Sequence, residues 1–170
     1  MQIKVIKGDI TKLDSSVDVI VNAANETLLG GGGVDGAIHN AAGIELLHEC
    51  MTLGGCEPGK AKATKAYKLP QKYIIHTVGP RYKYCENPQE ILRNCYKNSL
   101  ELADKLGCTT IAFPSIATGV FGYPVKEASK ICAEVLKGYK AKHLKCAYMV
   151  ILPRDQETYE AYIEAFNQKD

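Results

Sequence analysis

The residues whose types suit chemistry gather in one stretch, between the end of an apolar run and the start of a helical pattern. Two asparagines, Asn22 and Asn25, are followed by four consecutive glycines at positions 30–33 and then by Asp35. Asparagine offers both a donor and an acceptor, which suits the hydroxyl pair of a sugar. Glycines expose peptide N–H groups to a ligand, and a helix N-terminus attracts anions. The stretch therefore predicts an anion and sugar site, in which Asp35 is either a helix cap or a catalytic group.

Three further side chains carry alternatives of their own. His39 lies four residues after Asp35, so a helix would place both on one face, but a single histidine is often structural. Asp9, in the sequence Gly-Asp-Ile-Thr, either closes an Asx turn or accepts a hydrogen bond from a base amine. His76 lies within an apolar strand pattern, and we expect it to be structural.

The composition is that of an ordinary soluble domain. The chain has 170 residues, of which 46% are apolar and 24% charged, so we expect a single domain over residues 1–170. Its net charge of +2 argues against nucleic acid binding, and its apolar runs are too short to span a membrane. The seven cysteines are odd in number and form no C-x-x-C motif. This predicts free thiols in a reducing cytoplasm and no metal site.

Strand and helix patterns alternate along the chain, which predicts an α/β fold with three layers, α/β/α. Only about ten residues separate the first two strands, fewer than a parallel crossover usually needs, so we expect an antiparallel start and a mixed, mostly parallel sheet. The expected strands cover residues 2–7, 17–21, 63–69, 72–78, 109–113 and 146–152. The expected helices cover residues 35–50, 88–106, 125–139 and 155–166, with a surface loop at 51–62.

A second loop repeats the arrangement of the glycine stretch. Residues 114–124 follow an apolar strand, contain two glycines and precede a helical pattern. In open α/β sheets, ligands bind where the strands end. The two loops can therefore face each other across one cleft.

Other phosphate-site motifs fit the sequence poorly. Gly31, Gly33 and Gly36 spell G-x-G-x-x-G, but the second strand ending in an acidic residue that a dinucleotide fold needs does not follow. The G-x-x-x-x-G-K-[ST] loop and the G-x-S-x-G elbow of serine hydrolases are both absent from the sequence.

Five motifs occur in a fixed order along the chain. They are Gly-Asp-Ile-Thr, Val-Asn-Ala-Ala-Asn, the glycine run with Val-Asp-Gly-Ala-Ile-His, then His-Thr-Val-Gly-Pro and Ser-Ile-Ala-Thr-Gly-Val-Phe-Gly-Tyr-Pro. In this order and spacing they resemble the macro domain family over essentially the whole chain. The glycine run followed by Val-Asp-Gly is the most specific of them. It is similar to the hydrolase branch, which includes bacterial O-acetyl-ADP-ribose deacetylases and mono-ADP-ribosyl-protein hydrolases.

The resemblance implies an ADP-ribose cleft and gives its residues roles one by one. Asp35 would be the catalytic aspartate, with His39 near it and Asn25 on the distal ribose. Asp9 would bind the adenine amine beside the backbone of Ile10. The other substrate-binding residues that it implies are Asn22, Gly32, Gly33 and Val34 in the first loop, Ala117, Thr118, Gly119, Val120, Phe121 and Gly122 in the second, and Ile151 in the last strand.

Two positions depart from the family pattern. Where relatives carry an aromatic side chain against the adenine, this chain has Ile151 or Leu152, so aliphatic packing would replace ring stacking. Asn40 stands where an arginine commonly follows the histidine, and no chemical role is expected of that residue.

The residues and the resemblance together favour a hydrolase that binds ADP-ribose and cleaves the ester at its distal ribose, without a cofactor or a metal. The expected partners are ADP-ribose, O-acetyl-ADP-ribose and proteins with mono-ADP-ribose on Asp or Glu side chains. A cytoplasmic monomer is expected. The alternative is a module that binds ADP-ribose without turning it over, but the intact Asn25 and Asp35 favour the enzyme. RNA binding is a weaker alternative, because the net charge is nearly neutral.

Overall fold

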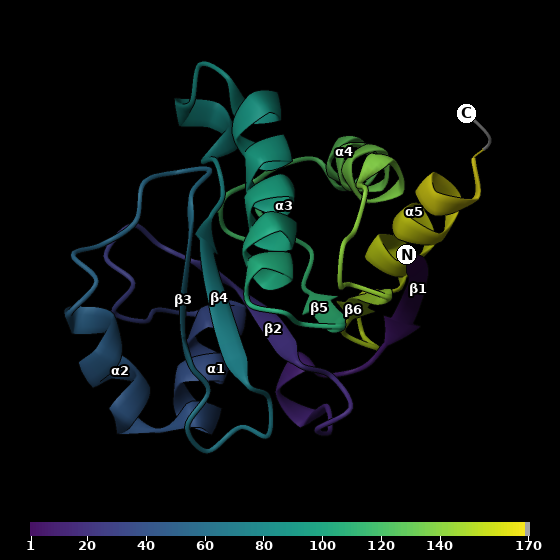
Figure 1. Ribbon diagram of the computed structural model, residues 1–170. Helices are drawn as coiled ribbons and strands as arrows, with labels where there is room; N and C mark the ends of the chain where they lie inside the picture. The colour runs from purple at the N-terminus through teal and green to yellow at the C-terminus, as the bar shows by residue number, and fades with distance from the viewer. Residues whose placement is uncertain (169–170) are drawn as a thin grey trace.

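The computed structural model describes residues 1–168 and shows one six-stranded sheet between two layers of helices (Figure 1). The order of the strands across the sheet is β1-β6-β5-β2-β4-β3, and β3 runs antiparallel to β4 while the other neighbours are parallel. The predicted mixed, mostly parallel sheet is therefore confirmed. The strands are β1 (Gln2–Lys7), β2 (Val19–Ala24), β3 (Ala61–Lys65), β4 (Tyr73–Val78), β5 (Thr110–Phe113) and β6 (Cys146–Ile151).

The predicted antiparallel start is wrong, because the first two strands are not neighbours. β1 pairs with β6, whereas β2 pairs with β4 and β5, each time in parallel. The apolar run of β2 is buried along nearly its whole length, which suits a central strand covered on both faces. β1 carries more exposed residues, as an edge strand does. Because β1 and β2 run in the same direction, the short connection crosses one face of the sheet, where Ile10 packs in the same core as Ala112 of β5 and Val150 of β6.

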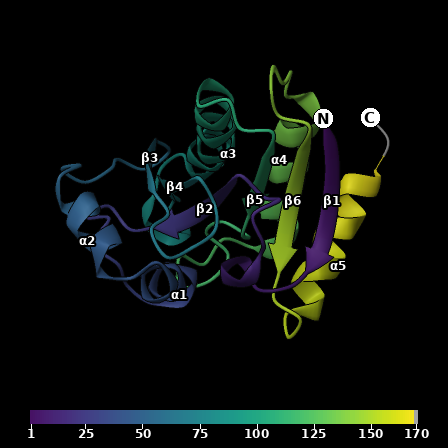
Figure 2. The ribbon, with the colours of Figure 1, turned by 60° about the horizontal axis from the view of Figure 1, so that its bottom comes forward.

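The helices divide between the two faces of the sheet (Figure 2). Side chains of β2 alternate between the two cores that result: Ile20 packs on the side of α1 and α2, and Val21 on the side of α3, α4 and α5. This confirms the three-layer α/β/α architecture. No helix within residues 1–168 is both long and apolar enough to cross a membrane. The helices are α1 (Gly33–Ala42), α2 (Ile44–Met51), α3 (Pro88–Lys105), α4 (Val125–Gly138) and α5 (Gln156–Asn167).

Three predicted boundaries need correction. The strand expected over residues 17–21 is β2 at Val19–Ala24, so Asn22 lies within the strand and Asn25 follows its end. The single helix expected over residues 35–50 is two helices, because Gly43, at φ 93°, ends α1 and donates its N–H to the His39 carbonyl at 3.0 Å. The apolar pattern continues through this break, so periodicity does not reveal it. The strand expected over residues 63–69 is shifted to Ala61–Lys65, because the chain turns at Tyr67, whose φ is 54°.

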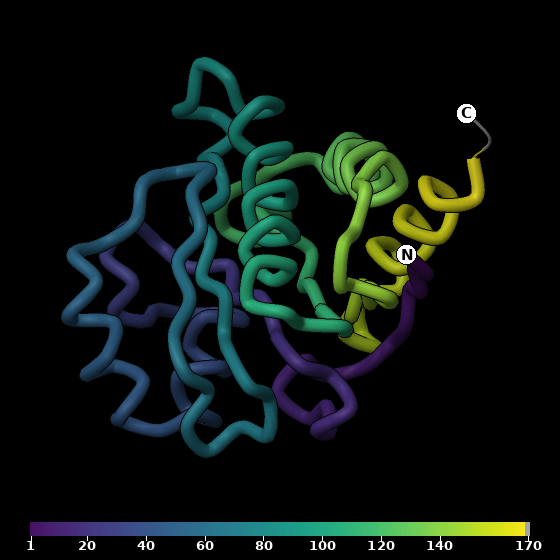
Figure 3. Tube along the Cα trace, in the orientation of Figure 1, coloured from purple at the N-terminus to yellow at the C-terminus, as the bar shows by residue number. Residues whose placement is uncertain are grey.

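The five parallel strands end at one edge of the sheet. Directly after them come Gly8, Asn25, Gly79, Pro114 and Leu152. The chain trace also shows the first strand beside the last helix (Figure 3). The Lys7 Nζ lies 4.8 Å from the ring centroid of Tyr159, so the two ends of the chain are tied together near this edge.

Candidate active site

A cleft of about 770 Å³ opens at the carboxyl ends of the parallel strands. One wall is the glycine turn before α1, the other is the loop after β5, and the ends of β1, β2 and β6 lie between them. The two loops therefore share one cleft, as the sequence predicts. The predicted site residues that line it are Asp9, Ile10, Asn25, Gly32, Gly33, Val34, Asp35, Ala117, Thr118, Gly119, Val120, Phe121 and Ile151.

The glycine turn depends on conformations and distances that favour glycine. Gly30 and Gly33 have φ values of 93° and 58°, in the left-handed region. A Cβ atom on Gly36 would lie 2.4 Å from the carbonyl oxygen of Gly31, so the turn folds back closely onto the start of α1. The result is exposed backbone at the N-terminus of a helix, which is suited to binding an anion.

Asn25 anchors this turn and also lines the cleft. Its Oδ1 accepts hydrogen bonds from the N–H and the hydroxyl of Thr27, at 3.1 and 2.6 Å. Its Nδ2 donates to the carbonyl of Gly30 at 3.0 Å. An amide nitrogen carries two hydrogens, so one of them is left to meet a ligand in the cleft.

Asp35 lies in the first turn of α1, lines the cleft on the side of β2 and is only 4% exposed. Gly32 occupies the N-cap and α1 has no side-chain cap, so the capping interpretation of Asp35 is not what the structure shows. Burial raises the pKa of Asp35, against the opposing effects of a hydrogen bond from Asn22 and of the nearby His39. A carboxylate with a raised pKa is a better proton acceptor, as a general base requires.

Asn22 and His39 lie behind Asp35 instead of in the lining of the cleft. Asn22 is fully buried, and its Nδ2 donates to Asp35 Oδ1 at 2.8 Å. His39 Nε2 lies 3.6 Å from the same oxygen, and it is buried without a hydrogen-bond partner among the described residues. Both side chains therefore contact the Asp35 carboxylate from the interior of the protein, not from the cleft.

The second loop, residues 114–124, forms a turn that is closed by backbone hydrogen bonds, and its tip is exposed. Ala117 has φ 67°, and its carbonyl accepts from the N–H of Tyr123 at 2.9 Å. Gly122 donates its N–H to the Gly119 carbonyl at 3.0 Å, so Gly122 shapes the turn and does not line the cleft. Val120, at the tip, is fully exposed. Residues 118–121 of this tip line the wall of the cleft opposite the glycine turn.

The other end of the cleft carries Asp9, Ile10 and the end of β6. Asp9 Oδ1 accepts from the N–H and hydroxyl of Thr11, at 2.9 and 2.6 Å, and these bonds lower its pKa. The turn interpretation of Asp9 is therefore confirmed, although the residue also lines the cleft. Ile151 is only 2% exposed, whereas Leu152 is partly exposed, so Leu152 offers more surface to a ligand.

Several lining residues were missed from the sequence. Ser115 bonds the Tyr162 hydroxyl at 2.8 Å and the Thr118 hydroxyl at 2.7 Å, which ties the second loop to α5. The Arg81 guanidinium lies 4.5 Å from the ring centroid of Phe121 and so supports that loop from outside. The expectation that ligands bind where strands end could have pointed to the segment after β6, but no local motif marks it. The other lining residues with polar or charged side chains that were missed are Arg154, Asp155 and Thr158.

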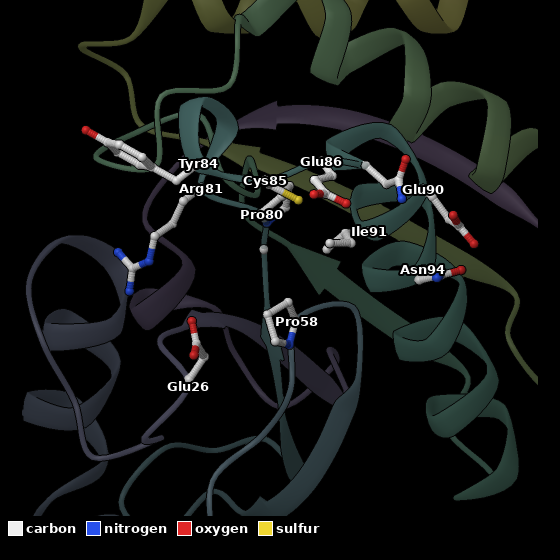
Figure 4. Close-up of a pocket in the computed structure, with 12 residues that line it drawn as sticks. Glu26, Pro58, Pro80, Arg81, Tyr84, Cys85, Glu86, Glu90, Ile91 and Asn94 are labelled. Carbon is white, nitrogen blue, oxygen red and sulfur yellow. The ribbon is translucent and has the colours of Figure 1, made fainter.

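A second cavity has a volume of about 500 Å³, and Gly79 lines both this cavity and the cleft. Figure 4 shows the residues that line the second cavity. Its lining includes Glu26, Glu86 and Glu90 beside Arg81. Three carboxylates repel an anion, and neither bare loop tip lines this cavity. The chemistry expected for a phosphate group therefore belongs to the larger cleft.

Within residues 1–168, no group of three or more His, Cys, Asp or Glu side chains is placed to hold a metal ion. The cysteines are all free thiols, and most of them are buried.

The fold and the cleft together define an α/β protein that offers two backbone anion sites and one buried carboxylate. The Macro domain family matches residues 21–132. The chain belongs to this family, and its resemblance to that family in sequence is confirmed.

Three comparisons give the range of its relatives. The macro domain-containing protein CT2219 of Chlorobaculum tepidum is 49% identical over 167 residues, covering 96% of each chain. The ADP-ribose glycohydrolase MACROD2 of Xenopus laevis is 48% identical over 96% of this chain and 40% of its own length. The Trypanosoma brucei macrodomain, solved in complex with ADP-ribose, is similar in structure with a TM-score of 0.83 and 40% identity, over 96% of this chain and 68% of the other.

Proposed function

We propose that this protein is a hydrolase that binds ADP-ribose and cleaves the ester at its distal ribose. The observation that carries the proposal is the position of Asp35, a buried carboxylate with a raised pKa that lines a cleft between two loops of exposed backbone. A protein that only binds ADP-ribose gains nothing from holding an ionisable carboxylate in a site where ionisation is disfavoured. The similarity to proteins called ADP-ribose glycohydrolases supports the same choice.

The two loops would hold the diphosphate through peptide N–H groups, at the N-terminus of α1 and at the tip of residues 118–121. The free amide hydrogen of Asn25 would bond a hydroxyl of the distal ribose. Asp35 would accept the proton of a water molecule as that water attacks the carbonyl carbon of the ester. It would then return this proton to the ribose oxygen as the bond between that oxygen and the carbonyl carbon breaks, which releases ADP-ribose and the free carboxylic acid. Every step is given to side chains and backbone, so the proposal needs no metal or cofactor.

The base would lie at the opposite end of the cleft. Asp9 Oδ1 is held by Thr11, which fixes the carboxylate where it can accept from the adenine amine beside the Ile10 backbone. Leu152 would pack on the adenine face in place of an aromatic ring. The proposed substrates are O-acetyl-ADP-ribose and proteins that carry mono-ADP-ribose on Asp or Glu side chains.

The test compares the natural protein with Asp35→Asn on both substrates, with product release measured against ADP-ribose binding by calorimetry. We expect hydrolysis to fall by about 10²- to 10⁴-fold while binding is kept, because the neutral amide cannot accept the proton. The control variant is Glu26→Gln, which removes an exposed carboxylate of the second cavity. Tight binding without any product in the natural protein would instead show a non-catalytic ADP-ribose module. Full activity in Asp35→Asn would remove Asp35 from the mechanism.

A further inference from the structure

We propose that His76 and Thr64, two buried residues outside the cleft, position the Asp35 carboxylate through the side chain of Asn22. The proposal rests on the proposed function only where catalysis is measured. The three residues come from three neighbouring strands, β2, β4 and β3, and Asn22 is paired directly with His76 in the sheet. None of the three lines the cleft.

The side chains form a continuous chain of contacts that ends on Asp35. Asn22 Nδ2 lies 2.8 Å from Asp35 Oδ1 and 3.1 Å from His76 Nδ1. His76 Nε2 lies 2.9 Å from Thr64 Oγ1. Asn22, His76 and Thr64 are each at most 2% exposed, so water does not compete for these bonds.

The positions of the protons follow from these contacts. The two hydrogens of Asn22 Nδ2 donate to Asp35 Oδ1 and to His76 Nδ1, so His76 Nδ1 is the acceptor. The proton of the neutral ring is then on Nε2 and is donated to Thr64 Oγ1. Burial lowers the pKa of His76 to about 3, so the ring is neutral at the pH at which proteins work. The opposite amide orientation would set Asn22 Oδ1 against the Asp35 carboxylate, with two acceptors in contact.

The Asn22 amide is held in this orientation only by the two hydrogen bonds that its Nδ2 donates. Its Oδ1 is buried and has no hydrogen-bond partner among the described residues. The bond to His76 Nδ1 is therefore one of two anchors. Thr64 Oγ1 stabilises the tautomer that provides this bond, because it accepts the Nε2 proton. Without them the amide can turn about its broad, nearly two-fold terminal torsion, and Asp35 loses the donor that favours its ionised form.

The other titratable groups that face Asp35 are His39 on the same helix, with Nε2 at 3.6 Å, and Cys50 on α2. Burial raises the pKa of the Cys50 thiol to about 11, so it is neutral, and its Sγ lies 4.0 Å from His76 Nε2. With His76 also neutral, the Asn22 amide is the hydrogen-bond donor to the carboxylate inside the protein. The positioning residues therefore control how readily Asp35 ionises.

The experiment uses Thr64→Val, which removes the hydroxyl at nearly constant shape, Thr64→Ser, which restores it, and His76→Leu. The matched control is Thr77→Val: Thr77 is also fully buried on β4, but its hydroxyl donates to the Lys60 carbonyl at 2.8 Å. Carbon-13 NMR follows the Asp35 carboxyl through a pH titration, identified by its loss in Asp35→Asn. Nitrogen-15 NMR identifies the tautomer of His76.

We expect the Nε2–H tautomer in the natural protein and a higher Asp35 pKa in Thr64→Val and His76→Leu, with the natural value in Thr64→Ser and Thr77→Val. We also expect kcat to fall about fivefold in Thr64→Val while the affinity for ADP-ribose stays constant. This factor is the rate change that corresponds to the loss of one ordinary hydrogen bond. The acid limb of its pH profile moves to higher pH. A Nδ1–H tautomer, or an unchanged Asp35 pKa in Thr64→Val, overturns the proposal. A natural protein without turnover refutes the proposed function instead, and the NMR results still decide the positioning role.

Discussion

The two ends of the sheet treat buried carboxylates in opposite ways. At the amino end, Asp104 accepts hydrogen bonds from the Tyr139 hydroxyl and from the backbone N–H groups of residues 142–144. Burial alone would raise the pKa of Asp104, but these bonds outweigh it and lower the pKa to about 2. At the carboxyl end, Asp35 is equally buried, but within residues 1–168 Asn22 is the one side chain that donates a hydrogen bond to it, and its pKa is raised.

The same contrast appears in Asp18, which joins the start of β2 to the start of β5. Its Oδ2 accepts from the N–H and hydroxyl of Thr109 at 2.8 and 2.9 Å, and Lys72 Nζ lies 3.6 Å from Oδ1. Its pKa is lowered because these partners outweigh the effect of burial. At the amino end of the sheet, ionised carboxylates thus bind backbone and side-chain donors from distant segments and hold those segments together. At the carboxyl end, the Asp35 carboxylate has few hydrogen-bond donors and accepts a proton more readily.

The largest effect on stability is expected for Asp104→Asn. Four donors would lose their charged acceptor, so the free energy of unfolding should fall by about 1.5–3 kcal/mol at pH 7. Since the pKa of Asp104 is lowered in the folded state, its contribution is present above its ordinary value of 3.8 and is lost as the pH falls through about 2. Urea unfolding at several pH values measures this. Glu101→Gln, on the exposed face of α3, should change stability by less than about 0.5 kcal/mol.

A smaller effect of opposite sign is expected for Asp35→Asn. The pKa of Asp35 is raised on folding, so its ionisation at neutral pH destabilises the folded state, and the neutral amide removes that penalty. The variant should unfold at a higher temperature at pH 7, and the gain should vanish below pH 3.8, where the carboxyl is protonated in both states. Thermal unfolding at pH 7 and pH 3.5 tests this. A loss of stability at pH 7 would remove the contrast between the two ends.

The smallest effect is expected for Leu152→Phe, at the base end of the cleft. An aromatic face should stack on the adenine and tighten ADP-ribose binding by about twofold to tenfold, provided that the side chain reaches the base. Calorimetry with ADP-ribose and with ribose 5-phosphate, which lacks the adenine, separates the contribution of the base to binding from that of the sugar. An equal gain for both ligands would place the adenine elsewhere.

Much of the fold could be predicted because its signals are local. The apolar runs marked the strands of the sheet, although β2 and β3 are displaced from their expected ranges, and the glycine turn before Asp35 marked the site. The break at Gly43 could not be predicted, since apolar periodicity continues through it and only the backbone conformation of one residue interrupts the helix. The order of β1 and β2 could not be predicted either, because it depends on strands more than ninety residues further along the chain.

The sequence by itself determined which residues can do chemistry: a bare backbone turn, asparagines and a carboxylate in one short segment. Only the tertiary structure decided what surrounds that carboxylate. Asn22 and His76 are 54 residues apart, and Thr64 lies on a strand that runs in the opposite direction. Their contact follows from the register of three paired strands, and the burial that raises the Asp35 pKa follows from the packing of α1 on the sheet. The local sequence pattern predicts neither the register of the strands nor the burial of Asp35, because both depend on segments that are distant in the sequence and meet only in the folded structure.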